Sequence, residues 1–200
     1  MNKLLVMIVA AMMATTSVQA QNGYEDTKHE VGVSYGYLSN SQWIDIFEEM
    51  TLIIFGSNLD NETFIGPISA EYFYRAKKWL GVGGILTYGH STQDVVSGKE
   101  KIKEGSASNT YITLMPAVKF DWLRKRYFGM YSKLAVGATL RSESVDYINP
   151  KYDNYSESAL HVNWQVSLLG LEFGSPKVRG FFELGSGEQG TTIFGLRYKF

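Results

Sequence analysis

The 200-residue sequence contains no cysteine and only four prolines. The absence of cysteine excludes disulfides, thiolate metal sites, a cysteine nucleophile and an acylated lipoprotein N-terminus. After the first 20 residues no run of about 18 consecutive apolar residues occurs, which excludes membrane-spanning helices there. The formal net charge of −1 argues against nucleic acid as a partner. Evidence on fold and function must therefore come from the order of apolar and polar residues along the chain.

The N-terminus has the pattern of an export signal. Lys3 is followed by an apolar run from Leu4 to Ala14, and small residues precede Gln21. The run is about half of the roughly 20 residues that a spanning helix needs, so a retained anchor is the weaker alternative. We predict a signal peptide over residues 1–20, cleaved between Ala20 and Gln21, and one domain over residues 21–200.

The remaining chain is rich in strand-forming and turn-forming residues, with 20 Gly, 13 Tyr and 11 Phe. Apolar and polar residues alternate with a period of two in eight segments, which predicts eight β-strands. The segment from Leu160 to Leu168 follows the rule at every position. The segments are Val31 to Tyr37, Ile68 to Tyr74, Leu80 to Tyr88, Ile112 to Phe120, Phe128 to Leu140, Leu160 to Leu168, Val178 to Leu184 and Phe194 to Phe200.

Alternation alone does not distinguish a soluble sandwich or lipocalin from a membrane barrel. The polar faces favour a membrane barrel because they are rich in glycine and small residues, which suit a narrow interior. The connections favour it too, because short basic turns alternate with long polar stretches, as expected of periplasmic turns and extracellular loops. The turns are 75–78, 123–126 and 174–177, and the polar stretches are 39–66, 90–109 and 142–158; only the last outer connection, at 188–190, is short.

Aromatic residues gather beside the short turns and the C-terminus, where they would form the inner girdle of a membrane barrel. We therefore predict an all-β fold, an eight-stranded antiparallel up-and-down transmembrane β-barrel. The residues expected in this girdle are Tyr72, Tyr74, Trp79, Phe120, Trp122, Tyr127, Phe173, Tyr198 and Phe200.

The C-terminal residues Gly195, Tyr198 and Phe200 have the spacing of the assembly signal of outer-membrane barrels, although Ile193 stands where that family usually has a polar residue. With its eight strands and signal peptide, the chain resembles small Gram-negative outer-membrane proteins of the OmpX, OmpW and OmpA-domain type. The resemblance concerns architecture only. It implies delivery by periplasmic chaperones, insertion by the outer-membrane assembly machinery, and contact with outer-membrane lipid and lipopolysaccharide.

Charged residues of both signs fall on the faces that such a barrel would enclose. Unpaired charges inside a narrow lumen cost several kcal/mol, so we expect mutual salt bridges, with Glu183 and Arg197 on neighbouring strands as the preferred pair. Eight strands enclose just enough room for side chains, which favours a filled plug over a solute path. The predicted lumen network consists of Glu71, Lys119, Lys133, Arg141, Arg179, Glu183 and Arg197.

Barrel enzymes that modify lipid A need a base near a nucleophile at the outer rim. His90 is followed by Ser91, but adjacent strand residues point to opposite faces, and the His-x-Ser arrangement of lipid A deacylase barrels is missing. His29 and His161 offer no better geometry. We expect structural histidines, no catalytic residue, no cofactor and no metal; Asp60 and Glu62 alone do not make a calcium loop.

Two local features lead to further predictions. Trp43, Ile46, Phe47 and Met50 have helical spacing after Ser39 and Gln42, which predicts a short helix that either caps the barrel mouth or binds a partner. The run from Thr51 to Phe55 is strand-like, with Thr63 to Ile65 as its hairpin partner. Pro116 interrupts a strand, where it predicts a β-bulge.

The first hypothesis is an integral outer-membrane barrel with a packed polar lumen and a structural or surface-interaction role, without catalysis. A narrow channel for small or apolar solutes is the second hypothesis, and a lipid A-modifying enzyme is the third.

Overall fold

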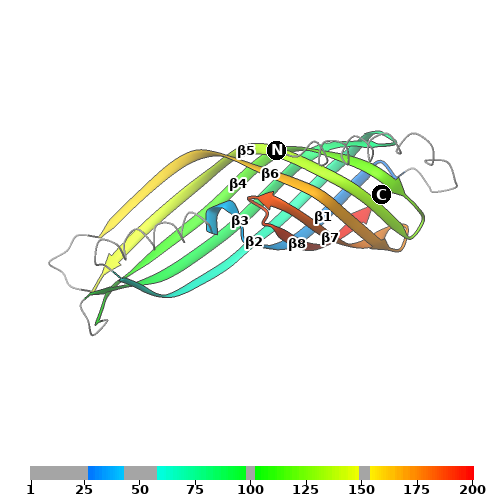
Figure 1. Ribbon diagram of the computed structural model, residues 1–200. Coiled ribbons are helices and arrows are strands. Elements are labelled where there is room, and N and C mark those ends of the chain that lie inside the picture. The colour runs from blue at the N-terminus through cyan, green and yellow to red at the C-terminus, as the bar shows by residue number, and fades with distance from the viewer. Residues whose placement is uncertain (1–26, 43–57, 98–101, 149–153) are drawn as a thin grey trace, which may run out of the picture.

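The computed structural model describes residues 27–42, 58–97, 102–148 and 154–200. Consecutive strands pair antiparallel, and β1 pairs with β8, so the sheet closes into a barrel (Figure 1). The predicted fold class is confirmed. The predicted signal peptide and its cleavage site at Ala20 and Gln21 lie outside the described residues. The strands are β1 His29–Tyr37, β2 Asn58–Lys77, β3 Leu80–Ser97, β4 Ile102–Arg124, β5 Phe128–Tyr147, β6 Tyr155–Gly174, β7 Val178–Gly187 and β8 Thr192–Lys199.

The barrel has its apolar side chains outside and its polar side chains inside. In β1 the exposed fraction is 60% for Val33 and 62% for Tyr37, whereas Glu30 and Ser34 are buried. The same alternation continues around the ring, for example with Leu114 exposed between the buried Thr113 and Met115. Because a water-soluble barrel would bury its apolar face, this inverted pattern is that of a barrel whose surroundings are lipid.

Exposed aromatic side chains border the apolar surface at two levels. Beside the short turns, His29 stacks on Phe200 with ring centroids 5.4 Å apart, and Trp79 stacks on Phe120 at 6.2 Å. We call this level the inner girdle. A second level, the outer girdle, lies where β1 ends and consists of Tyr35, Tyr37, Tyr88 and Trp164. Aromatic rings favour the interfaces of a bilayer, so the two levels mark the limits of the apolar belt.

The strands differ greatly in length. Strands β2 to β6 have 18 to 23 residues, whereas β1, β7 and β8 have 9, 10 and 8. Crossing a membrane needs about 9 to 11 tilted residues, so the five long strands continue well beyond the apolar belt. Figure 1 shows this projecting sheet at the end away from the short turns. Most of the stretches 90–109 and 142–158, expected as extracellular loops, belongs to β3, β4, β5 and β6, which extend well beyond the predicted strand segments.

The predicted start of a helix after β1 is present. Ser39 Oγ accepts a hydrogen bond from the Gln42 backbone N–H at 3.2 Å, and the Ser39 N–H donates to Gln42 Oε1 at 2.8 Å. This reciprocal arrangement is a capping box at the start of the helical residues 40–42. Residues 43–57, with Trp43, Ile46, Phe47, Met50 and the run 51–55, lie outside the described part. Within the described ranges, no helix has the length and apolar character to cross a membrane.

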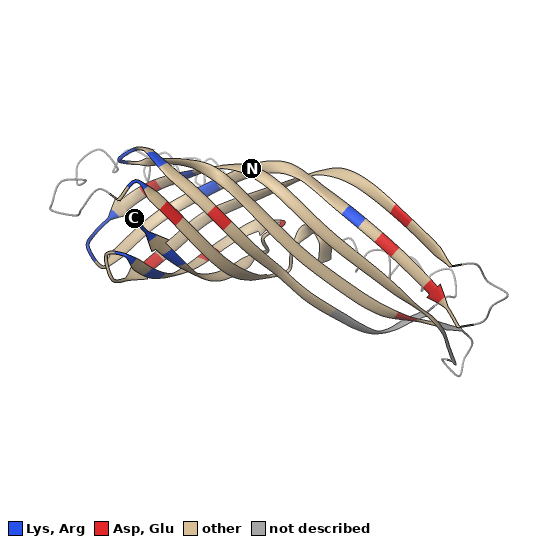
Figure 2. Ribbon diagram, turned by 180° about the vertical axis from the view of Figure 1, so that it is seen from behind, with Lys and Arg blue, Asp and Glu red and all other residues tan. Residues whose placement is uncertain are grey.

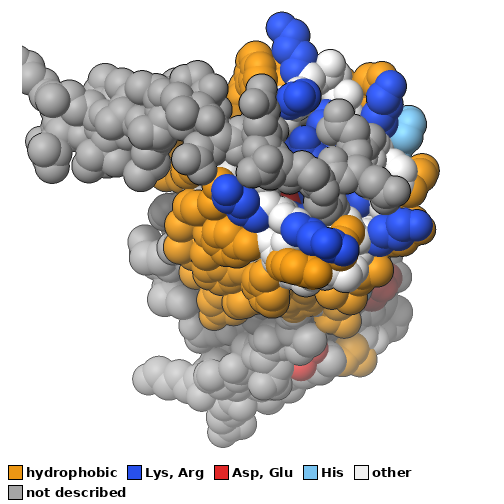
Figure 3. Space-filling view, turned by 90° about the vertical axis from the view of Figure 1, so that its right-hand side faces the viewer, with side chains coloured by type: hydrophobic (Ala, Val, Ile, Leu, Met, Phe, Trp, Pro, Cys, Tyr) orange, Lys and Arg blue, Asp and Glu red, His pale blue; other side chains and the backbone are white. Residues whose placement is uncertain are grey.

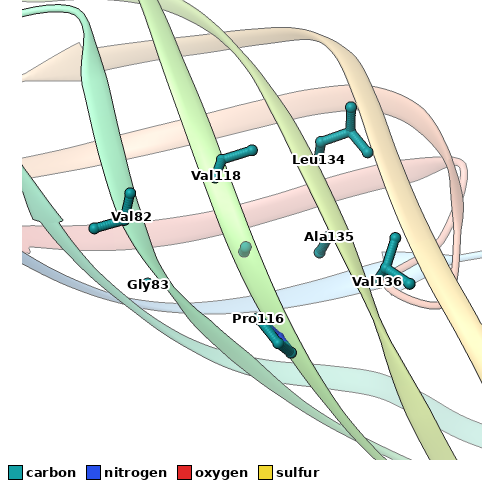
Figure 4. Close-up of a pocket in the computed structure, with 8 residues that line it drawn as sticks. Val82, Gly83, Pro116, Val118, Leu134, Ala135 and Val136 are labelled. Carbon is teal, nitrogen blue, oxygen red and sulfur yellow. The ribbon is translucent and has the colours of Figure 1, made fainter.

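The bulge predicted at Pro116 is wrong. On either side of Pro116, Leu114 pairs with Ala138 and Ala117 pairs with Ala135 in the same register, so no residue is inserted. Instead, residues 115 and 116 of β4 have no partner in the ladder with β5. Proline has no N–H to donate, and the ladder tolerates this by opening locally. A shallow apolar hollow lies on the outer surface there, and Figure 4 shows Pro116 in it between Val82 and Val136.

Gly137 lies opposite this gap and allows the two backbones to approach closely. A Cβ atom at this position would lie 2.0 Å from the Leu114 carbonyl oxygen, whereas a Cβ at Gly84 would meet only the Met115 carbonyl oxygen at 3.7 Å. We predict that Gly137→Ala lowers the free energy of unfolding by about 3 kcal/mol, and that Gly84→Ala changes it by less than about 1 kcal/mol. Urea unfolding in lipid vesicles, followed by the gel mobility of folded and boiled protein, measures both; equal midpoints for the two variants would contradict the close approach.

Candidate functional site in the barrel lumen

The half of the lumen near the short turns holds a group of buried charges that we call the lumen ion network. Its members come from every strand except β3. Five are acidic and six are basic, so the charges nearly cancel. The members are Glu30, Glu71, Asp121, Glu172 and Glu183 with Arg75, Lys119, Lys133, Arg179, Arg197 and Lys199.

Arg197 is the centre of this network. Its guanidinium donates from Nε to Glu71 Oε1 at 3.1 Å and from Nη1 to Glu172 Oε2 at 3.0 Å. Gly32 pairs with Glu71 on one side and with Arg197 on the other, and a Cβ on Gly32 would lie 2.9 Å from Glu71 Cγ. Because Gly32 has no side chain, the guanidinium of Arg197 and the carboxylate of Glu71 have room to meet above it. The centre of the Phe181 ring lies 4.4 Å from the guanidinium carbon of Arg197, which is a cation–π distance.

Lys133 connects this centre to the β5 side of the lumen. Its ammonium donates to Glu71 at 3.1 Å and to Glu183 at 2.9 Å. Glu183 also accepts hydrogen bonds from the Tyr131 hydroxyl at 2.6 Å and the Ser167 hydroxyl at 2.5 Å. Each buried charge thus has several partners, which offsets the cost of removing it from water.

Arg179 extends the network to the short turns. It donates to Glu172 at 2.6 Å and to the carbonyl oxygens of Lys125 and Arg126 at 2.8 and 3.0 Å. A weaker contact at 3.3 Å reaches the Ser175 carbonyl. The turn between β4 and β5 is thereby held to β7 across the barrel end.

The structure brings together six of the seven residues predicted for the lumen network. Arg141 lies apart, higher in the barrel, with Glu143 and Asn109 each 3.5 Å away. The preferred pair of Glu183 and Arg197 is present only at 3.8 Å, and the shorter contacts of Arg197 go to Glu71 and Glu172. The residues that sequence reasoning missed are Glu30, Arg75, Asp121, Glu172, Lys199 and Tyr131.

A second buried group, which we call the outer polar cluster, surrounds Glu188 in the turn between β7 and β8. Glu188 Oε1 accepts hydrogen bonds from the hydroxyls of Ser41 at 2.6 Å and Thr113 at 3.2 Å. Its Oε2 accepts from the Ser41 N–H at 3.1 Å and from Asn163 Nδ2 at 2.8 Å. The carboxyl thus joins the segment after β1 to β4 and β6, and all four donors are uncharged.

Burial raises the pKa of the Glu188 carboxyl above its ordinary value, while the hydrogen bonds from Ser41 and Asn163 act in the opposite direction. No sequence pattern pointed to this residue, because it lies in a turn. Its role is visible only when the segment after β1 is seen folded against it.

Apolar side chains fill much of the lumen between the two groups. Phe73, Ile85, Met115, Ala117 and Ala135 form a small buried cluster on the wall made by β2 to β5. Each is at most 5% exposed. The interior that the structure describes is therefore occupied by side chains, as expected for eight strands.

The three histidines lie in different places and have different partners. His29 contacts the Tyr72 hydroxyl at the inner girdle, at 2.8 Å. His90 on β3 contacts the hydroxyls of Thr110 at 3.1 Å and Thr92 at 3.3 Å. His161 is half-buried on β6. Among the described residues no group of three or more His, Asp and Glu side chains is placed to hold a metal ion.

The residues of the proposed assembly signal lie at the closure of the barrel. Gly195 faces the lumen, where a Cβ would lie 2.4 Å from the Phe181 ring. Tyr198 and Phe200 are exposed on the outer surface and stack on each other at 5.7 Å. The backbone of Phe200 exchanges two hydrogen bonds with His29, both 2.9 Å long, which join β8 to β1.

The closed ring, the exposed apolar belt and the charged, filled interior together define a transmembrane β-barrel of eight strands. No protein-family model matches the sequence, and no curated protein matches it. Two solved structures of Ail, the attachment invasion locus protein of Yersinia pestis, are similar in fold. One of them is a complex with the heparin analogue sucrose octasulfate; it has 15% sequence identity and a TM-score of 0.44, and the match covers 86% of this chain and 97% of that one. The other has 14% identity, a TM-score of 0.42 and the same coverage.

The first prediction from the lumen concerns Glu71. Glu71→Gln leaves Lys133 and Arg197 with less negative charge around them, and we expect the free energy of unfolding to fall by about 3 kcal/mol. Glu157→Gln, which changes an exposed carboxylate in the same way, should have an effect within about 0.5 kcal/mol. Adding Lys133→Met to Glu71→Gln should recover part of the loss, since it removes one of the excess cations. Urea unfolding in vesicles measures all three, and an effect of Glu71→Gln no larger than that of the control would refute the role of the network.

The second prediction concerns pH. Because the pKa of Glu188 is raised by folding, the folded protein holds this proton at pH values where the unfolded chain has lost it. The contribution of Glu188 to stability is therefore greatest in acid and declines as the pH rises from the ordinary carboxyl value through the raised one. Glu188→Gln has no proton to lose, and its amide can fit the same donors and hydroxyls. The stability of this variant relative to the parent protein should increase between pH 4 and neutrality; parallel stability curves would show that Glu188 does not titrate in this way.

Proposed function

We propose that this protein is an integral outer-membrane β-barrel with a closed lumen, whose projecting sheet makes contacts at the cell surface. The observation that carries the proposal is the difference in strand length. The long strands β2 to β6 rise beyond the ends of β1, β7 and β8, so the sheet continues outside the apolar belt. A barrel that only needed to span the membrane would not require these extensions.

The edge of β6 beyond Gln165, which has no ladder partner among the described residues, is the part of the sheet best suited to an interaction. The pairing of β6 with β7 stops at Gln165, while its pairing with β5 continues to Tyr155. Leu160 and Val162 on this edge are 73% and 80% exposed. An unpaired strand edge with exposed apolar side chains is a template for adding a strand from another chain. We infer that a partner with an extended segment binds there.

Placement in the outer membrane rests on the export signal and on the barrel itself. The proposal includes removal of residues 1–20 after Ala20, passage by periplasmic chaperones, and recognition of Gly195, Tyr198 and Phe200 by the assembly machinery. Lipid and lipopolysaccharide would then surround the apolar belt.

A channel and a lipid A-modifying enzyme receive less support. The lumen ion network, the apolar cluster and the outer polar cluster fill the interior between the two ends, which favours a plug.

His90 has threonine partners and lies on the outer surface of β3. Its neighbour Ser91 faces inward and is buried, so the two side chains point away from each other. Planar-bilayer recordings of the purified protein test the closed lumen, and discrete conductance steps from the folded protein would contradict it.

The absence of cysteine gives a direct test of location and orientation. Ser156→Cys places a single thiol on the projecting end of β6, and Lys177→Cys places one in the turn between β6 and β7. A membrane-impermeant maleimide added to intact cells should label the first variant and not the second. After the outer membrane is permeabilised, both variants should be labelled.

The parent protein, which has no thiol, is the control for background labelling. Heat-modifiable gel mobility of each variant confirms that it is folded. If intact cells labelled Lys177→Cys but not Ser156→Cys, the orientation would be the opposite of the one proposed. If the processed protein were recovered from the periplasm without detergent, the proposal would be rejected.

A further inference from the structure

The barrel end with the short turns carries a ring of exposed cations. We call it the basic ring, and it consists of Lys28, Lys77, Lys78, Lys125, Arg126 and Lys177, all exposed. They come from the segment before β1 and from all three short turns. Figure 3 views the molecule from this end and shows the basic side chains spread around the rim.

At the same end, three acidic residues of the described part are turned inward. Glu30, Asp121 and Glu172 are buried and belong to the lumen ion network, so none of them is exposed between the cations of the ring. At the opposite end the exposed or half-exposed charges include Glu143, Asp146 and Glu157. Figure 2 shows blue at the short turns, red on the strands of the adjoining half, and mainly red with some blue along the projecting strands. Among the described residues, the exposed charged side chains near the short turns are therefore cations, whereas acidic side chains predominate on the projecting strands.

The basic ring lies directly beside the inner girdle. The Lys77 ammonium is 5.6 Å from the centre of the Trp79 ring, and the Arg126 guanidinium is 5.5 Å from that of Tyr127. Trp79 and Tyr127 are themselves exposed on the lipid-facing side. Because such rings sit at the headgroup level of a bilayer, cations in contact with them lie at the depth of the lipid phosphates.

We propose that the basic ring binds the headgroups of anionic phospholipids in the membrane leaflet next to the short turns. This inference rests on the proposed membrane placement and adds a lipid preference to it. Lysine and arginine side chains near an anionic surface are attracted to it, and the attraction declines with salt. Phosphatidylglycerol carries the required negative charge, whereas phosphatidylethanolamine has no net charge.

A phospholipid fits the observations better than a soluble polyanion. The cations are arranged around the circumference of the barrel, where each can reach lipid, and two of them contact rings that face lipid. The carbonyl oxygens of Lys125 and Arg126 are held by Arg179 from inside the lumen, so that the backbone of this turn is fixed at the rim.

Tryptophan fluorescence provides a test that reports on each end separately. A variant that keeps only Trp79, with Trp43, Trp122 and Trp164 changed to Phe, reports on the cationic end. A matched variant that keeps only Trp164 reports on the outer girdle. Both are reconstituted in vesicles of phosphatidylglycerol and phosphatidylethanolamine in which one lipid at a time carries brominated acyl chains. Gel mobility first shows that each preparation is folded and inserted.

In the Trp79 variant, we expect quenching to give a binding constant for phosphatidylglycerol about threefold to tenfold higher than for phosphatidylethanolamine at low salt. The Trp164 variant should show a ratio near one. Changing Lys77, Lys78, Lys125 and Arg126 to Gln should abolish the preference at Trp79, whereas exchanging each lysine for arginine and the arginine for lysine should keep it.

Equal quenching by the two lipids at Trp79, or a preference that survives the four glutamine substitutions, would overturn the inference. The inference would also be overturned if the protein bound isolated peptidoglycan in a salt-sensitive way through these four cations and showed no preference between the two lipids. These results would leave the membrane placement intact, because the thiol labelling and gel mobility test that placement independently.

Discussion

The number of strands sets the constraint on which this structure depends. A ring of eight encloses only enough room for side chains, so the charged groups that point inward must find their partners among the others. Arg197 shows how this is met: one guanidinium lies within 4 Å of four carboxylates, those of Glu30, Glu71, Glu172 and Glu183. Glycine at position 32 provides the space for its contact with Glu71. The charged residues thus replace the apolar core of a soluble domain as the contacts that cross the barrel.

The two buried groups serve opposite ends of the closed part of the barrel. The lumen ion network ties seven strands together near the short turns and holds one turn through Arg179. The outer polar cluster uses a single carboxyl, Glu188, to gather three separate segments where β1, β7 and β8 stop. With both ends fastened, the five long strands are free to continue beyond the membrane as a sheet. The part that meets the environment is therefore built on a rigid base.

The alternation of side chains was enough to predict eight strands and the face of each that meets lipid, because lipid on one side and a polar lumen on the other give a strong period of two. The true strand lengths could not be predicted. Outside the apolar belt polar residues stand on both faces of a strand. The run Ser91, Thr92, Gln93 and Asp94 is polar at every position although it belongs to β3, and Ser91 and Gln93 are buried on its inner face. Without lipid, the periodic signal disappears while the hydrogen-bonded ladder continues.

The members of the lumen network were only partly predictable, for similar local reasons. Counting by two from Gln165 places Glu172 on the outer face, but the register shift between Ser167 and Leu169 reverses the count and turns Glu172 inward. Glu183 and Arg197 lie on neighbouring strands, as expected, yet the residue in register with Arg197 on β7 is Arg179. Contacts across a lumen depend on how far strands are staggered, and a pattern along one strand does not contain that information. Glu188 lies in a turn, where no periodicity exists.

Strand β3 contributes no charge to the lumen, and this has a mechanical consequence. Its inward positions near the short turns are Gly81, Gly83 and Ile85, and its neighbour β4 carries the gap in hydrogen bonding at Pro116. Strands β7, β8 and β1 are cross-braced by ion pairs, and β4 and β5 take part through Lys119, Asp121 and Lys133. Among the described residues near the short turns, β3 is held by its ladders and apolar contacts. The ring is therefore braced least at β3, next to the interrupted ladder of β4, and under strain the first separation is expected there.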